Sequence, residues 1–155
     1  MSRQNTGNTA SETKSVPNAP TSAVATNLGS GRAVNNGSAS VSFTTPFDGK
    51  MPITGYTVTP SPATSPATFT GATSPITVTN LASATAYTYT ITATNAIGTS
   101  AASAASAAVT ATTIPSVPSA PTATAGVNQD VVTWTAPSNG GSAITGYTLK
   151  SSDGP

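Results

Sequence analysis

The segment Tyr87-Thr-Tyr89-Thr-Ile91-Thr-Ala93-Thr94 alternates strictly between apolar side chains and threonines. The stretches 39–44 and 76–79 alternate in the same way. A period of two residues is typical of antiparallel strands with one buried and one solvated face, and threonine is a good strand former. The Ala-rich run 101–108 is interrupted by serines and followed by β-branched residues, so it indicates the approach to a strand rather than a helix. The sequence therefore predicts an all-β fold.

Two motifs occur twice along the chain. Val16-Pro-Asn-Ala-Pro-Thr21 recurs as Val117-Pro-Ser-Ala-Pro-Thr122, and Ile53-Thr-Gly-Tyr-Thr57 recurs as Ile144-Thr-Gly-Tyr-Thr148. The first pair is 101 residues apart and the second is 91 residues apart, so the first copy has ten extra residues, which fall within the Gly- and Asn-rich segment 28–38. A period near this length fits tandem β-sandwich domains better than a solenoid, whose units are shorter.

Alternation and turn residues place seven short strands in the first copy. We expect them at 22–27, 39–45, 53–60, 67–71, 76–81, 86–95 and 106–112. This number and spacing predict a seven-stranded, two-sheet antiparallel sandwich, followed by a partial second copy with counterparts of the first three strands. The predicted organisation is a polar N-terminal arm 1–16, a first domain 17–113, a linker 114–118 and a partial second domain 119–155.

The partial second copy would leave apolar strand residues such as Val132 without an opposing sheet, and strand edges without partners. Two explanations are open. Either the sequence is part of a longer protein, or a partner chain supplies the missing strands by β-augmentation.

Several motifs of the first copy occur together in one known family. They are the paired prolines Pro17 and Pro20, an aromatic residue at Phe43 that is repeated at Trp134, the segment Ile53-Thr-Gly-Tyr56, and the segment Leu81-Ala-Ser-Ala-Thr-Ala-Tyr87 followed by Ile91, Ala93, Asn95 and Gly98. In these motifs the chain resembles the fibronectin type III domain, although Ser83 stands where the family usually has proline and Phe43 where it usually has tryptophan. The resemblance implies an immunoglobulin-like sandwich in which the hydroxyl of Tyr87 bonds the backbone near the preceding turn, a tyrosine corner.

Charged and reactive residues are scarce. The 155 residues include five Lys or Arg and four Asp or Glu, with no His and no Cys. Thiolate or imidazole metal sites, thiolate nucleophiles, His general bases and disulfides are therefore excluded, and the scattered carboxylates disfavour a paired acid-base site. Five dispersed cations cannot form the basic stripe that nucleic acids require, and no apolar run is long enough to cross a membrane. The sequence predicts a non-enzymatic protein with no catalytic, cofactor-binding or metal-binding residues.

Period-two spacing places the aromatic residues and their aliphatic neighbours in a core rather than on a ligand-binding shelf. The predicted core residues are Phe43, Tyr56, Leu81, Tyr87, Tyr89, Ile91, Trp134 and Tyr147. Four loop residues are candidates for contacts with a partner. Arg32 and Lys50 either bind an anionic group or are simply solvated, and Phe47 and Met51 either plug the core or form an exposed contact patch.

Residues 1–16 are polar and mixed in charge, a composition that is typical of a flexible tail. The functional alternative is an arm that becomes ordered only against a partner. In that case Arg3, Glu12 and Lys14 are the candidate anchoring residues.

The polar N-terminus lacks the apolar segment of a secretory signal, and the chain lacks Cys, which is compatible with folding in the cytosol. Domains similar to fibronectin type III recur in bacterial surface proteins and in structural proteins of tailed bacteriophages. We therefore expect a structural or display protein of a bacteriophage virion, such as a capsid decoration, head fibre or tail component. Its N-terminal region would bind other virion proteins within an oligomeric assembly, and its repeats would bind host-surface glycan or protein weakly. The alternatives are an extracellular adhesin or spacer on a bacterial surface, and a linker domain of a secreted polysaccharide hydrolase.

Overall fold

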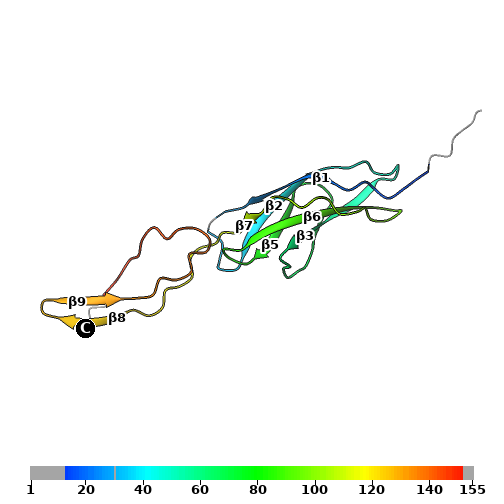
Figure 1. Ribbon diagram of the computed structural model, residues 1–155. Helices are drawn as coiled ribbons and strands as arrows, with labels where there is room; N and C mark the ends of the chain where they lie inside the picture. Colours follow the sequence, from blue (N-terminus) through cyan, green and yellow to red (C-terminus); the bar gives the residue numbers. More distant parts are fainter. Residues whose placement is uncertain (1–12, 30, 152–155) are drawn as a thin grey trace, which may run out of the picture.

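The computed structural model describes residues 13–29 and 31–151, and all regular secondary structure in these ranges is β-strand. The first domain consists of two antiparallel sheets (Figure 1). One sheet contains, in order, β1 (Thr21–Asn27), β2 (Gly37–Thr44) and β5 (Ile76–Leu81). The other contains, in order, β4 (Phe69–Gly71), β3 (Ile53–Ser61), β6 (Ala86–Asn95) and β7 (Val109–Thr110). The predicted all-β sandwich is confirmed.

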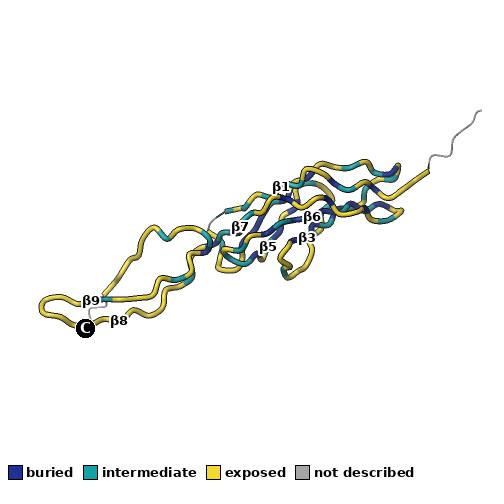
Figure 2. Tube along the Cα trace, viewed as in Figure 1, coloured by how far each residue is buried: buried dark blue, intermediate teal, exposed yellow. Residues whose placement is uncertain are grey.

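The core lies where the apolar faces of the two sheets meet. In β6 every second residue from Tyr87 to Asn95 is buried, as the alternation predicts. The buried apolar residues are Ala39, Val41, Phe43, Tyr56, Val58, Ile76, Val78, Leu81, Tyr87, Tyr89, Ile91, Ala93 and Ala111. Figure 2 shows that the buried residues are concentrated in this domain. The hydroxyl of Tyr87 accepts a hydrogen bond of 3.0 Å from the N–H of Ala82, so the tyrosine corner is formed.

The last predicted strand of the first domain is wrong in its extent. Instead of spanning 106–112, β7 has only two residues, and the segment 99–108 runs along β6 without forming a regular strand. The reason is its Ser-Ala-Ala repeat, in which only every third residue, Ser100, Ser103 and Ser106, is buried against β6. A period of three does not match the period of two that a β-ladder requires. The fourth strand also begins two residues later than predicted, at Phe69.

Ser83, which stands where the family usually has proline, connects three segments of the first domain. Its N–H donates to Asn35 Oδ1 at 3.2 Å, and its hydroxyl accepts a bond of 2.8 Å from the N–H of Asn35. The same hydroxyl also shares a hydrogen bond of 2.7 Å with Thr113 Oγ1. A proline has no N–H and no hydroxyl, so it could not hold the long 28–38 loop in this way.

The second unit contains one hairpin, formed by β8 (Thr122–Gly126) and β9 (Gln129–Thr133). The predicted third strand near Ile144 is not formed within the described range. The prediction that Trp134 and Tyr147 are core residues is also wrong, because they are 41% and 46% exposed. Both differences have one cause, which is that no second sheet lies over this hairpin in the described part of the chain. The residues from Ile144 onward therefore have no partner strand, and Trp134 and Tyr147 have no apolar layer to cover them.

The two units meet at a junction formed by residues 113–116 and 138–142. The N–H of Thr113 donates to the carbonyl oxygen of Gly140 at 2.8 Å, and the N–H of Ser116 donates to that of Ser138 at 3.0 Å. The N–H of Ile114 donates to the carbonyl oxygen of Arg32 at 2.9 Å. In Figure 1 the hairpin of the second unit extends beyond one end of the sandwich, which gives an elongated molecule. No helix in the described residues is long and apolar enough to cross a membrane.

Candidate functional site

One end of the first domain brings together three segments, 13–18, 45–52 and 95–98, which we call the Asn95 pole. Asn95 ends β6 and is buried. Its amide nitrogen donates to the carbonyl oxygens of Ser15 and Asp48, both at 2.8 Å. Its amide oxygen accepts from the N–H groups of Ile97 and Gly98 at 2.9 and 3.1 Å. All four hydrogen-bonding positions of this amide are used, so one side chain fixes all three segments.

Main-chain contacts hold the same segments together. The N–H of Ser15 donates to the carbonyl oxygen of Gly49 at 2.9 Å, and the N–H of Asn18 donates to that of Phe47 at 3.0 Å. Gly49 has a φ of 71°, and a Cβ there would overlap the carbonyl oxygen of Ser15 and lie 2.7 Å from that of Val16. Only glycine allows this approach of the two backbones. The pole is therefore a rigid surface, although it consists of loops.

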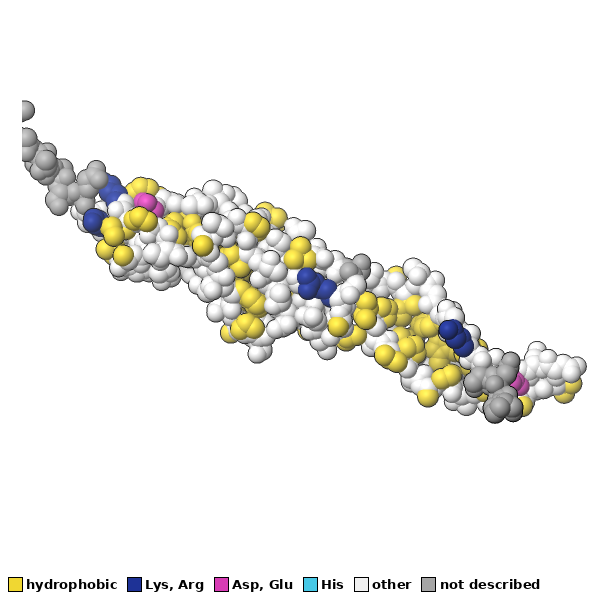
Figure 3. Space-filling view, turned by 180° about the vertical axis from the view of Figure 1, so that it is seen from behind, with side chains coloured by type: hydrophobic (Ala, Val, Ile, Leu, Met, Phe, Trp, Pro, Cys, Tyr) yellow, Lys and Arg dark blue, Asp and Glu magenta, His cyan; other side chains and the backbone are white. Residues whose placement is uncertain are grey.

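The Asn95 pole exposes large apolar side chains on each of its three segments. Val16 is 40% exposed, Phe47 is 56% exposed and Ile97 is 50% exposed. Figure 3 shows hydrophobic atoms at one end of the molecule beside basic and acidic side chains. The interpretation of Phe47 as a core plug is thus wrong, because the turn directs it outward, and the alternative of an exposed contact patch fits its position. Met51 is half-buried at the edge of this surface.

The remaining predicted residues are distributed over the whole molecule. Six of the eight predicted core residues are buried in the first domain: Phe43, Tyr56, Leu81, Tyr87, Tyr89 and Ile91. Arg32 is half-buried at the junction, so the structure does not bring it near Lys50, which is exposed at the pole. Lys14 is exposed beside the pole, while Arg3 and Glu12 lie outside the described residues.

Sequence reasoning missed the structural role of Asn95. The sequence did contain an indication, because Ile91, Ala93 and Asn95 lie on the same, inward-facing side of the alternating strand. A polar side chain that faces inward needs hydrogen-bond partners. The partners themselves, in segments 80 and 47 residues away, could not be identified from the alternation.

The titratable side chains in the three described segments of the pole are those of Lys14, Asp48 and Lys50. No group of His, Cys, Asp or Glu in the described ranges could hold a metal ion. Burial raises the pKa of Tyr89 to about 12, with a smaller contribution from nearby Tyr87, so its hydroxyl remains protonated at neutral pH.

Comparisons with known proteins agree with this architecture. The sequence model of the Fibronectin type III domain matches residues 18–109, more than half of the chain. Domains A168–A170 of titin are 25% identical over 61% of this chain and 32% of that one, with a TM-score of 0.50. The FN1–FN3 domains of chicken CNTN1 are 22% identical over 76% of this chain and 41% of that one, with a TM-score of 0.49. The chain thus spans less than half the length of either structure, and no curated protein matched. On the family match, this chain belongs to the fibronectin type III family.

Proposed function

We propose that this protein is a non-enzymatic structural and display component of a bacteriophage virion, bound to the particle through the Asn95 pole and the adjoining N-terminal residues. Fibronectin type III domains are typically structural or adhesion-like modules and are generally non-catalytic. The observation that carries the proposal is the set of exposed apolar side chains on three segments that one buried amide holds rigid. A preorganised apolar surface loses little conformational entropy on binding, which favours a stable contact.

A comparison of the two units supports a partner other than another sandwich of this kind. In the second unit the equivalent loop faces the first domain and is made of small residues. A Cβ on Gly141 would lie 3.0 Å from the carbonyl oxygen of Ala111 and 3.2 Å from Cα of Ala84, and its φ of 87° disfavours a side chain, so a larger residue would be both crowded and strained there. The first domain has larger residues at these repeat positions: Phe47, Lys50 and Met51 stand where the second unit has Ser138, Gly141 and Ser142.

The direct test is to purify phage particles from a strain that encodes the protein and to search for its peptides by mass spectrometry. We expect the protein in the particles. We further expect the double variant Phe47→Ser, Ile97→Ser to lower its copy number in particles about tenfold or more, because two partly exposed apolar side chains no longer add contact area. The matched control is Val24→Ser, Leu28→Ser, which removes two exposed apolar side chains away from the pole.

Both variants should melt at the temperature of the wild-type domain, because the substituted side chains are exposed. The proposal fails if the protein is absent from particles or if the pole variant is incorporated as well as the control. Recovery of the protein from the bacterial envelope, or joined to a catalytic domain in the medium, would support the adhesin or the hydrolase linker instead.

A further inference from the structure

Two asparagines of the chain, Asn36 and Asn139, are followed directly by glycine. Such a pair can deamidate without an enzyme, because the main-chain nitrogen of a glycine, which no side chain shields, can attack the side-chain carbonyl carbon of the asparagine before it. Asn139 is exposed and lies in the segment 138–142 of the junction. The fold places the two pairs in different surroundings, and these surroundings favour reaction at Asn139.

The turn at Asn139 is arranged for this attack. Asn139 Oδ1 accepts the N–H of Gly141 at 2.9 Å. This hydrogen bond closes a turn around the intervening peptide bond and brings the side-chain carbonyl group toward the nitrogen of Gly140. The N–H of Gly141 thereby points at the oxygen on which negative charge develops, as the donors of an oxyanion hole do. The N–H of Gly140 donates to no described residue, so no hydrogen bond to it has to break before the reaction.

Asn36 is in the opposite situation. Gly37 is the first residue of β2, lies opposite Leu81 of β5, and would place a Cβ 3.0 Å from that of Ala111. Its nitrogen cannot turn toward the side chain of Asn36 without disturbing the sheet. Asn36 Oδ1 also accepts no N–H group from the residues that the structure describes, so no donor would stabilise the charge of the attack.

Asn139 stands between the two carbonyl groups that hold the junction. The carbonyl oxygen of Ser138, directly before it, accepts the N–H of Ser116 at 3.0 Å. The carbonyl oxygen of Gly140, directly after it, accepts the N–H of Thr113 at 2.8 Å. The backbones have no room to shift, since a Cβ on Gly140 would overlap the carbonyl oxygen of Thr113. A longer main chain between these two carbonyl groups would therefore break the pairing.

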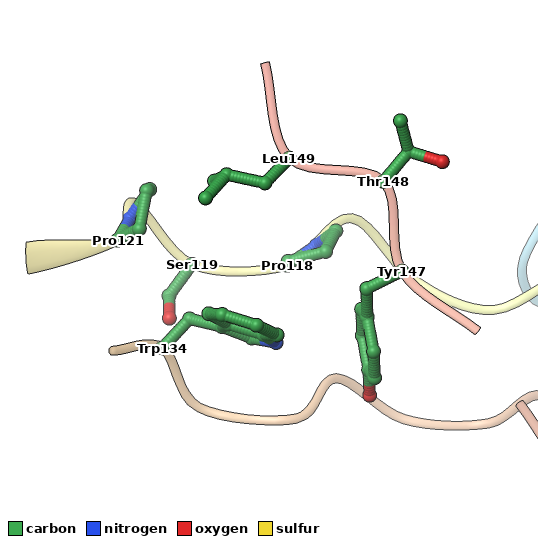
Figure 4. A pocket seen from close by; sticks show the side chains of 7 residues that line it. All are labelled: Pro118, Ser119, Pro121, Trp134, Tyr147, Thr148 and Leu149. Carbon is green, nitrogen blue, oxygen red and sulfur yellow. The ribbon is translucent and has the colours of Figure 1, made fainter. Parts of the chain in front are cut away.

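The aromatic side chains of the second unit do not strengthen this connection. They are Trp134 and Tyr147, whose rings meet edge to face with centroids 5.3 Å apart. Together with Pro118 and Pro121 they line a cavity of about 130 Å³ within the second unit (Figure 4). The orientation of the second unit on the first therefore depends on the main-chain hydrogen bonds around Asn139.

We propose that Asn139 deamidates spontaneously and that the isoaspartate formed there releases the second unit from the first. The main-chain nitrogen of Gly140 loses its proton and attacks Cγ of Asn139, ammonia leaves, and a succinimide ring remains. Water then opens the ring at either carbonyl carbon. Attack at Cγ gives aspartate, whereas attack at the main-chain carbonyl carbon gives isoaspartate, in which the main chain runs through Cβ and Cγ. The proposal is independent of the virion role.

The internal repeat distinguishes the two products. Asp48 stands 91 residues before Asn139 and is likewise followed by a glycine. Asp48 Oδ1 accepts the N–H of Lys50 at 2.8 Å, which is the same turn with a carboxylate in place of the amide. An aspartate at position 139 therefore fits the turn of the junction. Isoaspartate does not, because its longer main chain moves the two carbonyl groups of the junction away from their donors.

The test is to incubate the full-length protein at neutral pH and physiological temperature and to follow both asparagines by peptide mapping with mass spectrometry. We expect Asn139 to be converted roughly tenfold faster than Asn36 or more, because one donor aimed at a developing oxyanion changes a rate by at least this factor. In concentrated urea the two sites should react at similar rates, because both then lose the contacts of the folded state. Labelling by an isoaspartyl methyltransferase identifies the isoaspartate.

Small-angle scattering measures the effect on the junction. Aged protein that contains isoaspartate should show a broader distribution of interatomic distances than fresh protein, while the melting temperature of the first domain is unchanged. Asn139→Asp is the matched control. It introduces the charge of the product without lengthening the main chain, so it should scatter like the fresh wild-type protein.

The proposal is overturned if Asn139 stays an amide in the folded protein while it reacts in urea, or if Asn36 reacts as fast as Asn139 in the folded protein. It is also overturned if protein that contains isoaspartate scatters like fresh protein. Broader scattering of Asn139→Asp by itself would overturn it too, because charge rather than main-chain length would then open the junction.

Discussion

Two neighbouring tyrosines on β6 differ in whether their hydroxyls are bonded. The rings of Tyr87 and Tyr89 are stacked with centroids 6.5 Å apart, and both are buried. The hydroxyl of Tyr87 accepts the N–H of Ala82, whereas the hydroxyl of Tyr89 has no hydrogen-bond partner among the described residues. A buried polar group without a partner lowers stability, while one with a partner contributes to it.

The same Tyr→Phe substitution should therefore have opposite consequences at these two positions. Tyr87→Phe leaves the N–H of Ala82 without its acceptor and should lower the free energy of unfolding by about 1–2 kcal/mol. Tyr89→Phe removes an unpaired hydroxyl and should be neutral or slightly stabilising. Urea unfolding of the two variants measures the difference. Equal losses would show that the hydroxyl of Tyr89 has a partner that this structure does not contain.

The raised pKa of Tyr89 predicts a loss of stability at high pH. Its folded-state pKa of about 12, caused first by burial, lies above the value of 10.0 for an unperturbed tyrosine. Between these values the folded state binds more protons than the unfolded state, so the free energy of unfolding falls as the pH rises from about 10 to 12. We expect a loss of up to about 2 kcal/mol that Tyr89→Phe abolishes. Unfolding free energies measured across this range in both proteins provide the test, and parallel curves would contradict the assignment to Tyr89.

At the scale of the element, the segment 99–108 runs along the edge of the sheet β4-β3-β6-β7, and its serines form hydrogen bonds with the backbone of β6. The N–H groups of Tyr89, Ile91 and Ala93 donate to the hydroxyls of Ser106, Ser103 and Ser100 at 3.0–3.1 Å. The N–H groups of the same serines donate back to the carbonyl oxygens of β6 at 2.8–2.9 Å. Each serine therefore satisfies one donor and one acceptor of β6, and the alanines between them face solvent. Because this edge has a period of three, it is a poor template for a further strand.

Removing one serine hydroxyl should measure how much these hydrogen bonds contribute to the free energy of unfolding. Ser103→Ala leaves the buried N–H of Ile91 without an acceptor and should cost about 1–3 kcal/mol. The control is Ala104→Ser at the neighbouring exposed position, which should change the free energy of unfolding by less than about 0.5 kcal/mol. Thermal and urea unfolding of both variants decide the matter. If both substitutions change the free energy of unfolding equally, the buried serines of the three-residue repeat do not contribute more to stability than the exposed alanines.

At the scale of the whole molecule, the main-chain hydrogen bonds that hold the N-terminal segment at the Asn95 pole have counterparts at the junction between the two units. Thr113 donates to Gly140 as Ser15 donates to Gly49, and Ser116 donates to Ser138 as Asn18 donates to Phe47. A Cβ on Gly140 would overlap the carbonyl oxygen of Thr113 and lie 2.6 Å from that of Ile114, which repeats the close approach at Gly49. The junction thus orients the second unit on the first with the same backbone geometry that fixes the N-terminal segment.

This geometry predicts that Gly140→Ala loosens the junction without unfolding the first domain. Gly140 also has a φ of 66°, which a side chain disfavours. Small-angle scattering should show a broader distribution of interatomic distances, while the melting temperature of the first domain is unchanged. Gly146→Ala is the matched control, because a Cβ there meets no atom within 4 Å and its φ is not positive. If both variants scatter alike, the junction does not depend on the close approach at Gly140.

The sequence predicted features that depend on local periodicity. The alternation in β6 and its neighbours indicated the sandwich and the six predicted core residues that are buried in the first domain, because side chains on a strand alternate between its two faces whatever the partner. The tyrosine corner was implied by the resemblance of the motif ending at Tyr87 to the fibronectin type III family, and the bond from Ala82 N–H confirms it. The alternation could not predict the Asn95 pole, because the hydrogen bonds of Asn95 join segments that are distant in the chain.

The pentapeptide Ile-Thr-Gly-Tyr-Thr shows where local sequence stops being sufficient. At Ile53–Thr57 it is part of β3, and at Ile144–Thr148 the identical residues form no strand in the described chain. The sequence analysis pairs Val16 with Val117, but the structure uses a different register at the junction, where Thr113 and Ser116 take the places of Ser15 and Asn18. The two registers are similar in sequence, because Ile114-Pro-Ser116 and Val117-Pro-Ser119 are nearly the same tripeptide. A strand exists only when a second backbone satisfies its N–H and C=O groups, and a register is fixed only by close contacts such as that at Gly140. The sequence determined which residues can face inward, and the tertiary structure decided which of them have a partner.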